Sequence, residues 1–360
     1  MTDGIGPTGV TPLGHEVFQI DTRMAGYEGI TAGYLIRGER PCLVETGTAP
    51  SAPVVRDALA ALGIGPGDLA TVVVTHIHLD HAGGAGDIAA MFPAARIVVH
   101  QRGARHHADP SRLMAGARLV YGRALERLFG VLAPVPAERI VALDDTGTVD
   151  LGGGRRLDSH YSPGHAKHHV GLVDSDTGDL YVGDAAGVYM PDTGDVRPAT
   201  PPPDFDLAAA LASIRKFAAL RPARLMFSHY GPVDQVSETL DRSAEEINVW
   251  VEETRRVHAA GLDLDHAVAM VRDRTLNRYA AASPDADPAL AERFERASSV
   301  RGNVEGIMQW LDKGGDPAAG RSETGIQGVR THSRTPWIRD FTALERTGSG
   351  VSCHSTWFGT

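Results

Sequence analysis

Three histidines and one aspartate directly after a short apolar segment constrain this chain more than any other feature. Residues 71–75 read TVVVT, which is typical of a strand buried on both faces. His76, His78, Asp80 and His81 follow within six residues. On a strand, His76 and His78 would point to the same side, and a turn would bring Asp80 and His81 round at the start of a helix. Imidazole and carboxylate groups at this spacing suit two adjacent metal ions: zinc, iron or manganese.

The alternative is a set of ordinary buried histidines held by hydrogen bonds. A lone buried histidine is more often such a core residue than a metal ligand. Four titratable groups placed together without a cation would, however, be costly in lost hydration and mutual crowding. The cluster therefore favours a metal site.

The first two thirds of the chain alternate β-branched runs with helical patterns, which predicts an α/β fold. The predicted strands cover residues 17–20, 34–37, 42–45, 71–75, 96–99, 155–159, 170–174, 180–182 and 225–228. The predicted helices of this part cover residues 51–62, 87–92, 111–129 and 207–220. Residues 198–203 contain four prolines and are predicted to form a loop or lid.

After about residue 235 the β signal disappears. Helices are predicted there over residues 237–260, 265–274 and 288–312. With 360 residues in all, we divide the chain into a catalytic domain (1–236), a helical C-terminal subdomain (237–313) and a tail (314–360). The tail is rich in Gly, Ser, Thr and Arg, and we expect it to be flexible.

Charge and composition exclude several classes of function. A net charge of -10 argues against a protein that mainly grips nucleic-acid phosphates. Two cysteines are too few for a disulfide framework, which favours the cytoplasm. The N-terminus lacks the pattern of a signal peptide, and no apolar run is long enough for a membrane span.

Three later residues suit the rest of a two-metal site. His165, Asp184 and His229 each follow a predicted strand. Open α/β sheets gather their active sites at strand ends, so we expect these side chains to converge on the first cluster.

The order of these residues resembles the pattern of the metallo-β-lactamase superfamily, H-x-H-x-D-H followed by His, Asp and His. The resemblance covers about residues 15–235. It implies a four-layered αβ/βα sandwich with two metal ions at one edge of the packed sheets. It also implies a set of ligands for each ion: His76, His78 and His165 for the first, Asp80, His81 and His229 for the second, with Asp184 as a bridge.

The resemblance departs from the usual pattern at Glu45, where the superfamily has an aspartate in a short D-T-G turn. That residue orients the ligands by hydrogen bonding, and a longer glutamate can do the same; an ordinary strand-end carboxylate is the alternative. Of His168 and His169, one is expected to orient ligands and the other to be structural; we choose His169 for the first role.

The implied chemistry is hydrolysis. Two close cations lower the pKa of a shared water towards 7, and the resulting hydroxide attacks a carbonyl or phosphorus. Asp80 is the candidate catalytic residue, because it can hold both a metal and the proton released by the nucleophile. Candidate substrate contacts are Tyr230, Tyr189 and one of His100 and His107, for which we choose His107. An exposed helix start is the alternative for these histidines.

Residues 99–113 and the helical C-terminal part are similar to a prokaryotic glyoxalase-II-like branch. This similarity favours a small thioester, ester or lactone as substrate. The runner-up is a phosphodiesterase or nuclease, followed by a single-iron sulfur dioxygenase and a di-iron oxidoreductase; the last of these usually has Glu where this chain has His78. A non-catalytic scaffold is the remaining alternative. The helical part either covers the mouth of the site or forms a homodimer contact, and the sequence does not decide between them.

Overall fold

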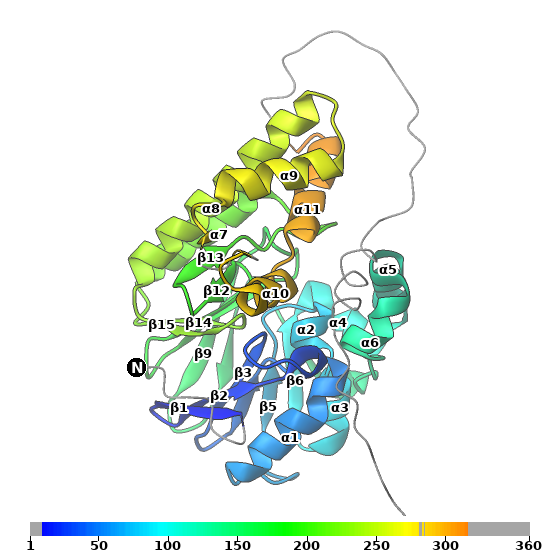
Figure 1. Ribbon diagram of the computed structural model, residues 1–360. Helices are drawn as coiled ribbons and strands as arrows, with labels where there is room; N and C mark the ends of the chain where they lie inside the picture. Colours follow the sequence, from blue (N-terminus) through cyan, green and yellow to red (C-terminus); the bar gives the residue numbers. More distant parts are fainter. Residues whose placement is uncertain (1–8, 281–282, 284, 316–360) are drawn as a thin grey trace, which may run out of the picture.

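Two β-sheets form the centre of the molecule, and helices cover the outer face of each sheet (Figure 1). The structure is a computed structural model that describes residues 9–280, 283 and 285–315. The first sheet has seven strands in sequence order: β1 (Val10–Gly14), β2 (Val17–Asp21), β3 (Ala32–Ile36), β4 (Cys42–Val44), β5 (Thr71–Val73), β6 (Arg96–His100) and β7 (Ile140–Leu143). Pairing is antiparallel from β1 to β4 and parallel from β4 to β7.

The second sheet has six strands in the order β15-β14-β11-β10-β9-β8. Their bounds are β8 (Thr146–Asp150), β9 (Arg156–Tyr161), β10 (Val170–Asp174), β11 (Leu180–Gly183), β14 (Leu225–Phe227) and β15 (Gly231–Val233). Only β11 and β14 pair in parallel within this sheet. A separate hairpin is formed by β12 (Val188–Met190) and β13 (Asp195–Arg197).

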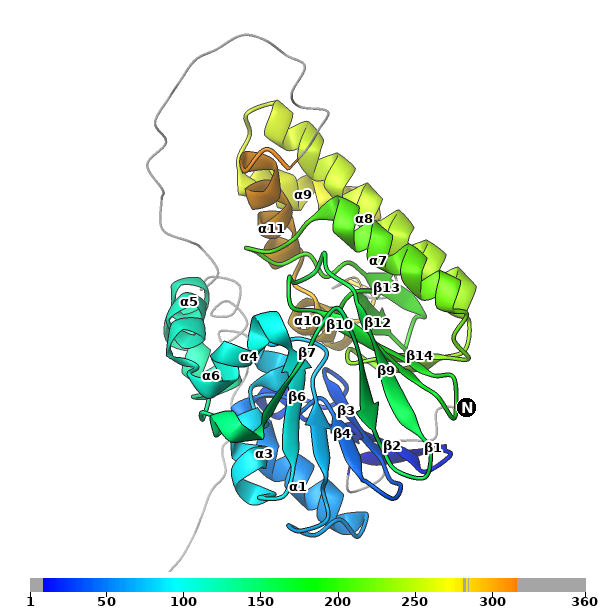
Figure 2. The same cartoon turned by 180° about the vertical axis from the view of Figure 1, so that it is seen from behind.

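Buried apolar side chains fill the spaces between layers. The inner faces of the two sheets meet at Tyr34 and Tyr181, whose ring centroids lie 5.3 Å apart. Helices α1 (Ala52–Ala61) and α3 (Ala85–Met91) pack on the outer face of the first sheet. Helices α7 (Leu207–Leu220) and α8 (Val236–Ala259) pack on the second sheet (Figure 2). The expected four-layered sandwich is thus confirmed.

The C-terminal helices share one apolar core with the second sheet, in which Trp250 and Ile307 are buried together with Phe227. They are α8, α9 (Leu264–Thr275), α10 (Pro288–Ala297) and α11 (Val300–Asp312). The single helix predicted over residues 288–312 was wrong. The chain leaves the helical path at Ser298, and the Ser299 hydroxyl caps α11 by accepting a hydrogen bond from Gly302 N–H.

The helix predicted over residues 111–129 is likewise two helices, α5 (Ser111–Tyr121) and α6 (Leu125–Phe129). Gly122 separates them with a φ of 53°, which an α-helix does not accommodate. A short helix that was not predicted, α4 (Gln101–Ala108), precedes them. Residues 198–203 form a loop, as predicted.

Two other expectations stay predictions. The division of the chain at residues 236 and 237 is not tested by the shared core. Residues 316–360 of the expected tail lie outside the described residues. In the described part of the chain, no helix is both long and apolar enough to cross a membrane.

Candidate metal centre

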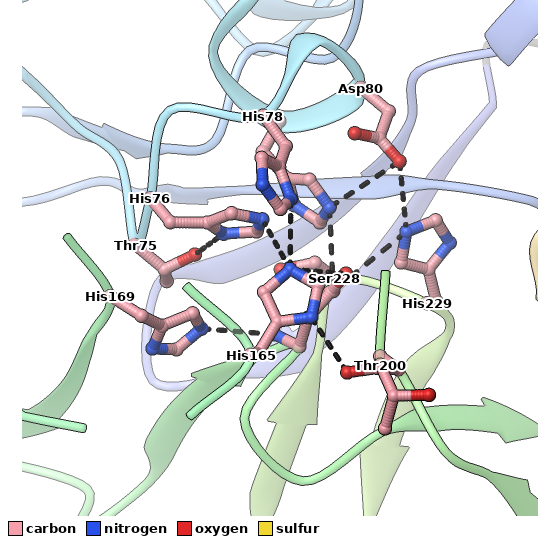
Figure 3. Close-up of polar contacts among 12 residues, drawn as sticks. Thr75, His76, His78, Asp80, His165, His169, Thr200, Ser228 and His229 are labelled. Atoms are coloured by element: carbon pink, nitrogen blue, oxygen red, sulfur yellow. Dashed lines mark hydrogen bonds and ion pairs between the residues drawn. The ribbon is translucent and has the colours of Figure 1, made fainter. Parts of the chain in front are cut away.

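All of the predicted metal ligands lie together at one edge of the two sheets (Figure 3). His76 and His78 follow β5, and Asp80 and His81 belong to α2 (Leu79–Ala82). The second sheet contributes the other three: His165 from the β9–β10 loop, Asp184 directly after β11 and His229 shortly after β14. The strand ends of both sheets therefore supply the site.

One group of donors consists of three imidazoles. Nε2 of His165 lies 3.2 Å from Nε2 of His76 and 2.9 Å from Nδ1 of His78. These three nitrogens all lie within 4.8 Å of one another. Three imidazole nitrogens that converge in this way match the donor set of a zinc site.

A second group combines one carboxylate with two imidazoles. Oδ2 of Asp80 lies 3.6 Å from Nε2 of His81 and 3.4 Å from Nε2 of His229. The donor atoms of these three residues also lie within 4.8 Å of one another. This set of N and O donors suits zinc, iron or manganese.

Asp184 lies between the two groups. Its Oδ1 is 3.3 Å from His81 Nε2 and 3.8 Å from His229 Nε2, whereas its Oδ2 is 3.5 Å from His165 Nε2. Each carboxylate oxygen therefore faces a different group. Oδ1 of Asp184 and Nε2 of His81 are buried without a hydrogen-bond partner, which is costly unless something else binds them. A cation between these atoms fits this arrangement.

Three of the histidines are oriented through the ring nitrogen that faces away from the other donors. His165 Nδ1 donates to the carbonyl of Ala199 (2.9 Å), and His229 Nδ1 donates to the carbonyl of Ile30 (2.8 Å). His76 Nδ1 lies 3.0 Å from the Thr75 hydroxyl. A proton on Nδ1 leaves the Nε2 lone pair free, so these contacts select the tautomer that a metal ligand needs.

Glu45, which is predicted to orient ligands, forms hydrogen bonds with Thr75, the residue before His76. Its Oε1 accepts hydrogen bonds from the Thr75 N–H and hydroxyl and from the Ser228 hydroxyl. The same oxygen lies 3.8 Å from Nδ1 of His81. Glu45 also forms a third possible donor group with His76 and His81, which overlaps the other two. Its role stays a prediction.

His169, the other residue predicted to orient ligands, touches the backbone that carries Asp184. Its Nε2 accepts a hydrogen bond from Asp184 N–H at 3.1 Å, and its Nδ1 lies 2.8 Å from the Ser162 hydroxyl. The preceding residue, Gly183, has a φ of 51°, and a Cβ there would lie 2.4 Å from His169 Nε2. Glycine is therefore required for Asp184 to leave β11 in this direction.

Burial and nearby charge shift the pKa of His81 in the opposite direction from the pKa values of the three histidines in the first group. Burial, reinforced by His165, lowers the pKa of His78 to about 4. Burial also lowers the pKa values of His76 and His165, so this group is neutral and able to bind metal at pH 7. Burial opposes charge on His81 as well, but the Asp184 and Asp80 carboxylates outweigh it and raise the pKa of His81 to about 10. This side of the site therefore favours a positive charge.

The two aspartates remain anionic. Burial acts to raise the pKa of Asp80, yet the His81 and His229 imidazoles hold it below its ordinary value. The same balance, with His81 as the largest favourable partner, lowers the pKa of Asp184. Both aspartates thus keep the negative charge that a divalent cation requires, and a cation bound beside them would take the place of the proton on His81.

The structure does not bring the three predicted substrate contacts to the donor atoms. The Tyr230 hydroxyl donates to Oδ2 of Asp21 at 3.3 Å. The Tyr189 ring packs against Phe227, with centroids 5.7 Å apart. His107 is buried on α4, and its Nε2 has no hydrogen-bond partner. Their part in substrate binding stays a prediction.

A small apolar pocket lies beside the second group. It is lined by Met24, Ala25, Tyr27, Ile30, Leu128 and Arg296. Arg296 of α10 stacks over the Tyr27 ring, 3.9 Å from its centroid. The Ile30 carbonyl holds His229, and Leu128 packs in one cluster with Leu79. Three segments far apart in sequence, at residues 24–30, Leu128 and Arg296, thus line this pocket.

Comparison with known proteins identifies relatives of this chain. A family model described as the Metallo-beta-lactamase superfamily matches residues 26–229. The chain is 28% identical over 188 residues to the metallo-beta-lactamase fold-containing protein ST1585 of Sulfurisphaera tokodaii, across 49% of this chain and 69% of that protein. It is 22% identical over 246 residues to the probable metallo-hydrolase YqjP of Bacillus subtilis, across 62% of this chain and 74% of that protein.

Solved structures share the fold. The crystal structure of ST1585 from Sulfolobus tokodaii aligns with a TM-score of 0.55 and 22% identity, covering 65% of this chain and 87% of that one. The metallo-beta-lactamase family protein TTHA1429 from Thermus thermophilus aligns with a TM-score of 0.54 and 21% identity, covering 79% of this chain and 89% of that one. At these identities, the likeness concerns the architecture alone.

Proposed function

This chain belongs to the Metallo-beta-lactamase superfamily, and from that premise we propose that it is a metal-dependent hydrolase that cleaves a thioester, ester or lactone. The observation that carries the proposal is the position of Asp184, with one oxygen facing each group of donors. A carboxylate placed in this way can join two ions. Two divalent ions, with Zn²⁺ as our first choice over Fe or Mn, are therefore part of the proposal.

In this proposal, His76, His78 and His165 hold one ion, and Asp80, His81 and His229 hold the other. When bound, such a pair supplies a water that ionises near pH 7 and positive charge for the developing oxyanion. Asp184 keeps the two sets of donors at a constant separation. The imidazoles whose second nitrogens bind Ala199, Ile30 and Thr75 keep their lone pairs in place.

Asp80 is the proposed proton acceptor. Its Oδ2 is directed at His81 and His229. Its side chain is 22% exposed, against 7% for Asp184, so of the two aspartates it is the one open to an entering substrate. The proton of the attacking water would pass to its other oxygen, Oδ1, and from there to the leaving group.

The apolar hollow lined by Ile30 and Leu128 has a volume of about 10 Å³, the space of one water molecule, so it does not indicate a substrate class. The choice of a thioester, ester or lactone rests on the resemblance of residues 99–113 and the C-terminal helices to the glyoxalase-II-like branch. The proposal also keeps the cytoplasm as the place of action and a small molecule as substrate.

Metal analysis followed by a substrate panel tests the proposal. The purified protein is expected to hold two zinc ions per chain and to hydrolyse thioesters, esters or lactones. A phosphodiester in the same panel represents the runner-up chemistry. Cleavage of that phosphodiester faster by orders of magnitude would overturn the choice of substrate, and a chain that binds no divalent ion would overturn the function.

A further inference from the structure

The loop of residues 198–203 is tied to the C-terminal helices at both of its ends. The Ser298 hydroxyl donates to the carbonyl of Pro198 at 2.9 Å. The Lys313 ammonium donates to the carbonyl of Pro203, also at 2.9 Å. A segment that the sequence predicts to be a loop or lid is thus bound by residues on either side of α11.

Between these two ends, hydrogen bonds join Thr200 of the loop to Asn303 of α11. Thr200 is fully buried, and its N–H donates to Oδ1 of Asn303 on α11 at 2.6 Å. The Thr200 hydroxyl donates to the carbonyl of Asn303 at 3.1 Å. Asn303 Nδ2 in turn donates to the Ser298 hydroxyl. Gly306, one turn further along α11, lets the helix approach closely, since a Cβ there would lie 1.9 Å from the Thr200 carbonyl oxygen.

The same loop holds a histidine of the metal centre. The residue before Thr200 is Ala199, whose carbonyl accepts the hydrogen bond from His165 Nδ1. The direction of the His165 ring therefore depends on where this carbonyl lies. The matching contact of the second group, where the Ile30 carbonyl accepts from His229 Nδ1, does not involve the loop of residues 198–203.

We propose that Asn303 is a positioning residue for His165, and that it acts through Thr200 and the carbonyl of Ala199. The inference rests on the proposed function, because it takes His165 as a ligand of the first ion. Without the Asn303 side chain, the buried N–H of Thr200 loses its acceptor and the loop moves to find another. The carbonyl of Ala199 moves with it, and the His165 imidazole is no longer held in one tautomer and direction.

The expected result is a selective loss of zinc affinity. Asn303→Ala should lower the affinity for one of the two ions by about 10–100-fold, the range seen when a group that orients a ligand histidine is removed. Gly306→Ala should do the same while keeping every hydrogen-bonding group, because its methyl group would push Thr200 away from Asn303. Gly116→Ala is its matched control, since a Cβ on this α5 residue meets nothing within 4 Å. Zinc affinity is measured by competition with a chelator.

Two backgrounds identify which ion is affected. A His229→Ala protein keeps the donors of the first group, and in this background Asn303→Ala should lower the affinity for zinc. A His165→Ala protein keeps the donors of the second group, and in this background Asn303→Ala should leave the affinity for zinc unchanged. An equal effect in both backgrounds would overturn the inference.

A further control separates positioning from general destabilisation. Thr254→Val removes a buried hydroxyl that bonds to Trp250 within α8, and it has no connection to the loop. It should lower the melting temperature and leave both zinc affinities unchanged. If Asn303→Ala lowers only the melting temperature, as Thr254→Val does, Asn303 has no positioning role. Failure of the proposed function would look different, because the unmodified chain itself would then bind no zinc.

Discussion

The side chain of Glu45 accepts two hydrogen bonds from Thr75, one from the backbone N–H at 3.2 Å and one from the hydroxyl at 2.5 Å. Thr75 precedes His76, and its hydroxyl also contacts the His76 ring. The Glu45 carboxylate thus contacts the His76 ring indirectly, through Thr75. It is buried, and burial raises the pKa of Glu45.

Glu45→Gln should change stability and metal binding in opposite directions. The substitution keeps the shape of the side chain but removes a charge whose burial is unfavourable, so the metal-free protein should melt at an equal or higher temperature. The affinity for zinc should fall by about 10–100-fold, because His81 loses the carboxylate that faces its Nδ1. Thermal melting with a chelator and zinc titration measure the two effects. Glu39→Gln, on an exposed turn, should change neither.

Asp184→Asn should uncouple the two groups of donors. An amide has one oxygen where the carboxylate has two, so it cannot face both groups with a negative ligand atom. We expect zinc content to fall below two ions per chain and kcat/KM to fall by about 10²–10³-fold. Asp174→Asn is the matched buried control, because Asp174 pairs with Arg155 away from the site. Unchanged zinc content in Asp184→Asn would contradict the bridging role.

Removal of metal should destabilise the folded chain. An ion that binds only the native state adds about 2.7 kcal/mol when its free concentration is 100 times its dissociation constant. Zinc should therefore raise the melting temperature of chelator-treated protein, and His229→Ala should reduce that rise. Mg²⁺, which prefers oxygen ligands, should have little effect in comparison. An equal response to both cations would indicate nonspecific binding to the acidic surface.

His107 should make the protein sensitive to acid. Burial, with a smaller contribution from His106, lowers the pKa of His107 to about 4. In the unfolded chain His107 is protonated below about pH 6.5, whereas in the folded chain it stays neutral down to about pH 4. The contribution of neutral His107 to stability is therefore complete above pH 6.5 and falls as the pH drops towards 4. The loss is about 3 kcal/mol at most. Thermal unfolding at several pH values should show a flatter profile for His107→Leu than for the unmodified protein.

The same variant tests the predicted substrate contact. A core residue without a hydrogen bond at Nε2 should be replaceable without loss of kcat/KM at pH 7. A large fall in kcat/KM, with stability intact, would show that His107 contacts the substrate after all.

Helix boundaries were predictable where local signals were complete. Residues 207–220 carry a regular apolar spacing and follow Asp206, whose side chain caps the helix, so prediction and structure agree for α7. Between α10 and α11 the apolar spacing continues on both sides of Ser298, and the break depends on contacts with the distant loop of residues 198–203. Strand β8 was missed because it is short and mostly exposed, so it lacks an apolar alternation.

The convergence of the candidate metal ligands was predictable for a similar reason. His76 to His81 form a local pattern, and the order of the remaining ligands resembles a known family. The groups that orient them left no such signal. Ile30 and Ala199 act through backbone carbonyls, which every residue has, and Asn303 resembles any polar residue on an amphipathic helix.

The tie between Thr200 and Asn303 spans 103 positions of the chain. It limits how such proteins can be recombined. A chimaera whose crossover falls between these two positions would join a loop from one parent to a helix from another, and the carbonyl beside His165 would be set by a mismatched pair. Crossovers placed before residue 198 or after residue 313 keep both partners from the same parent.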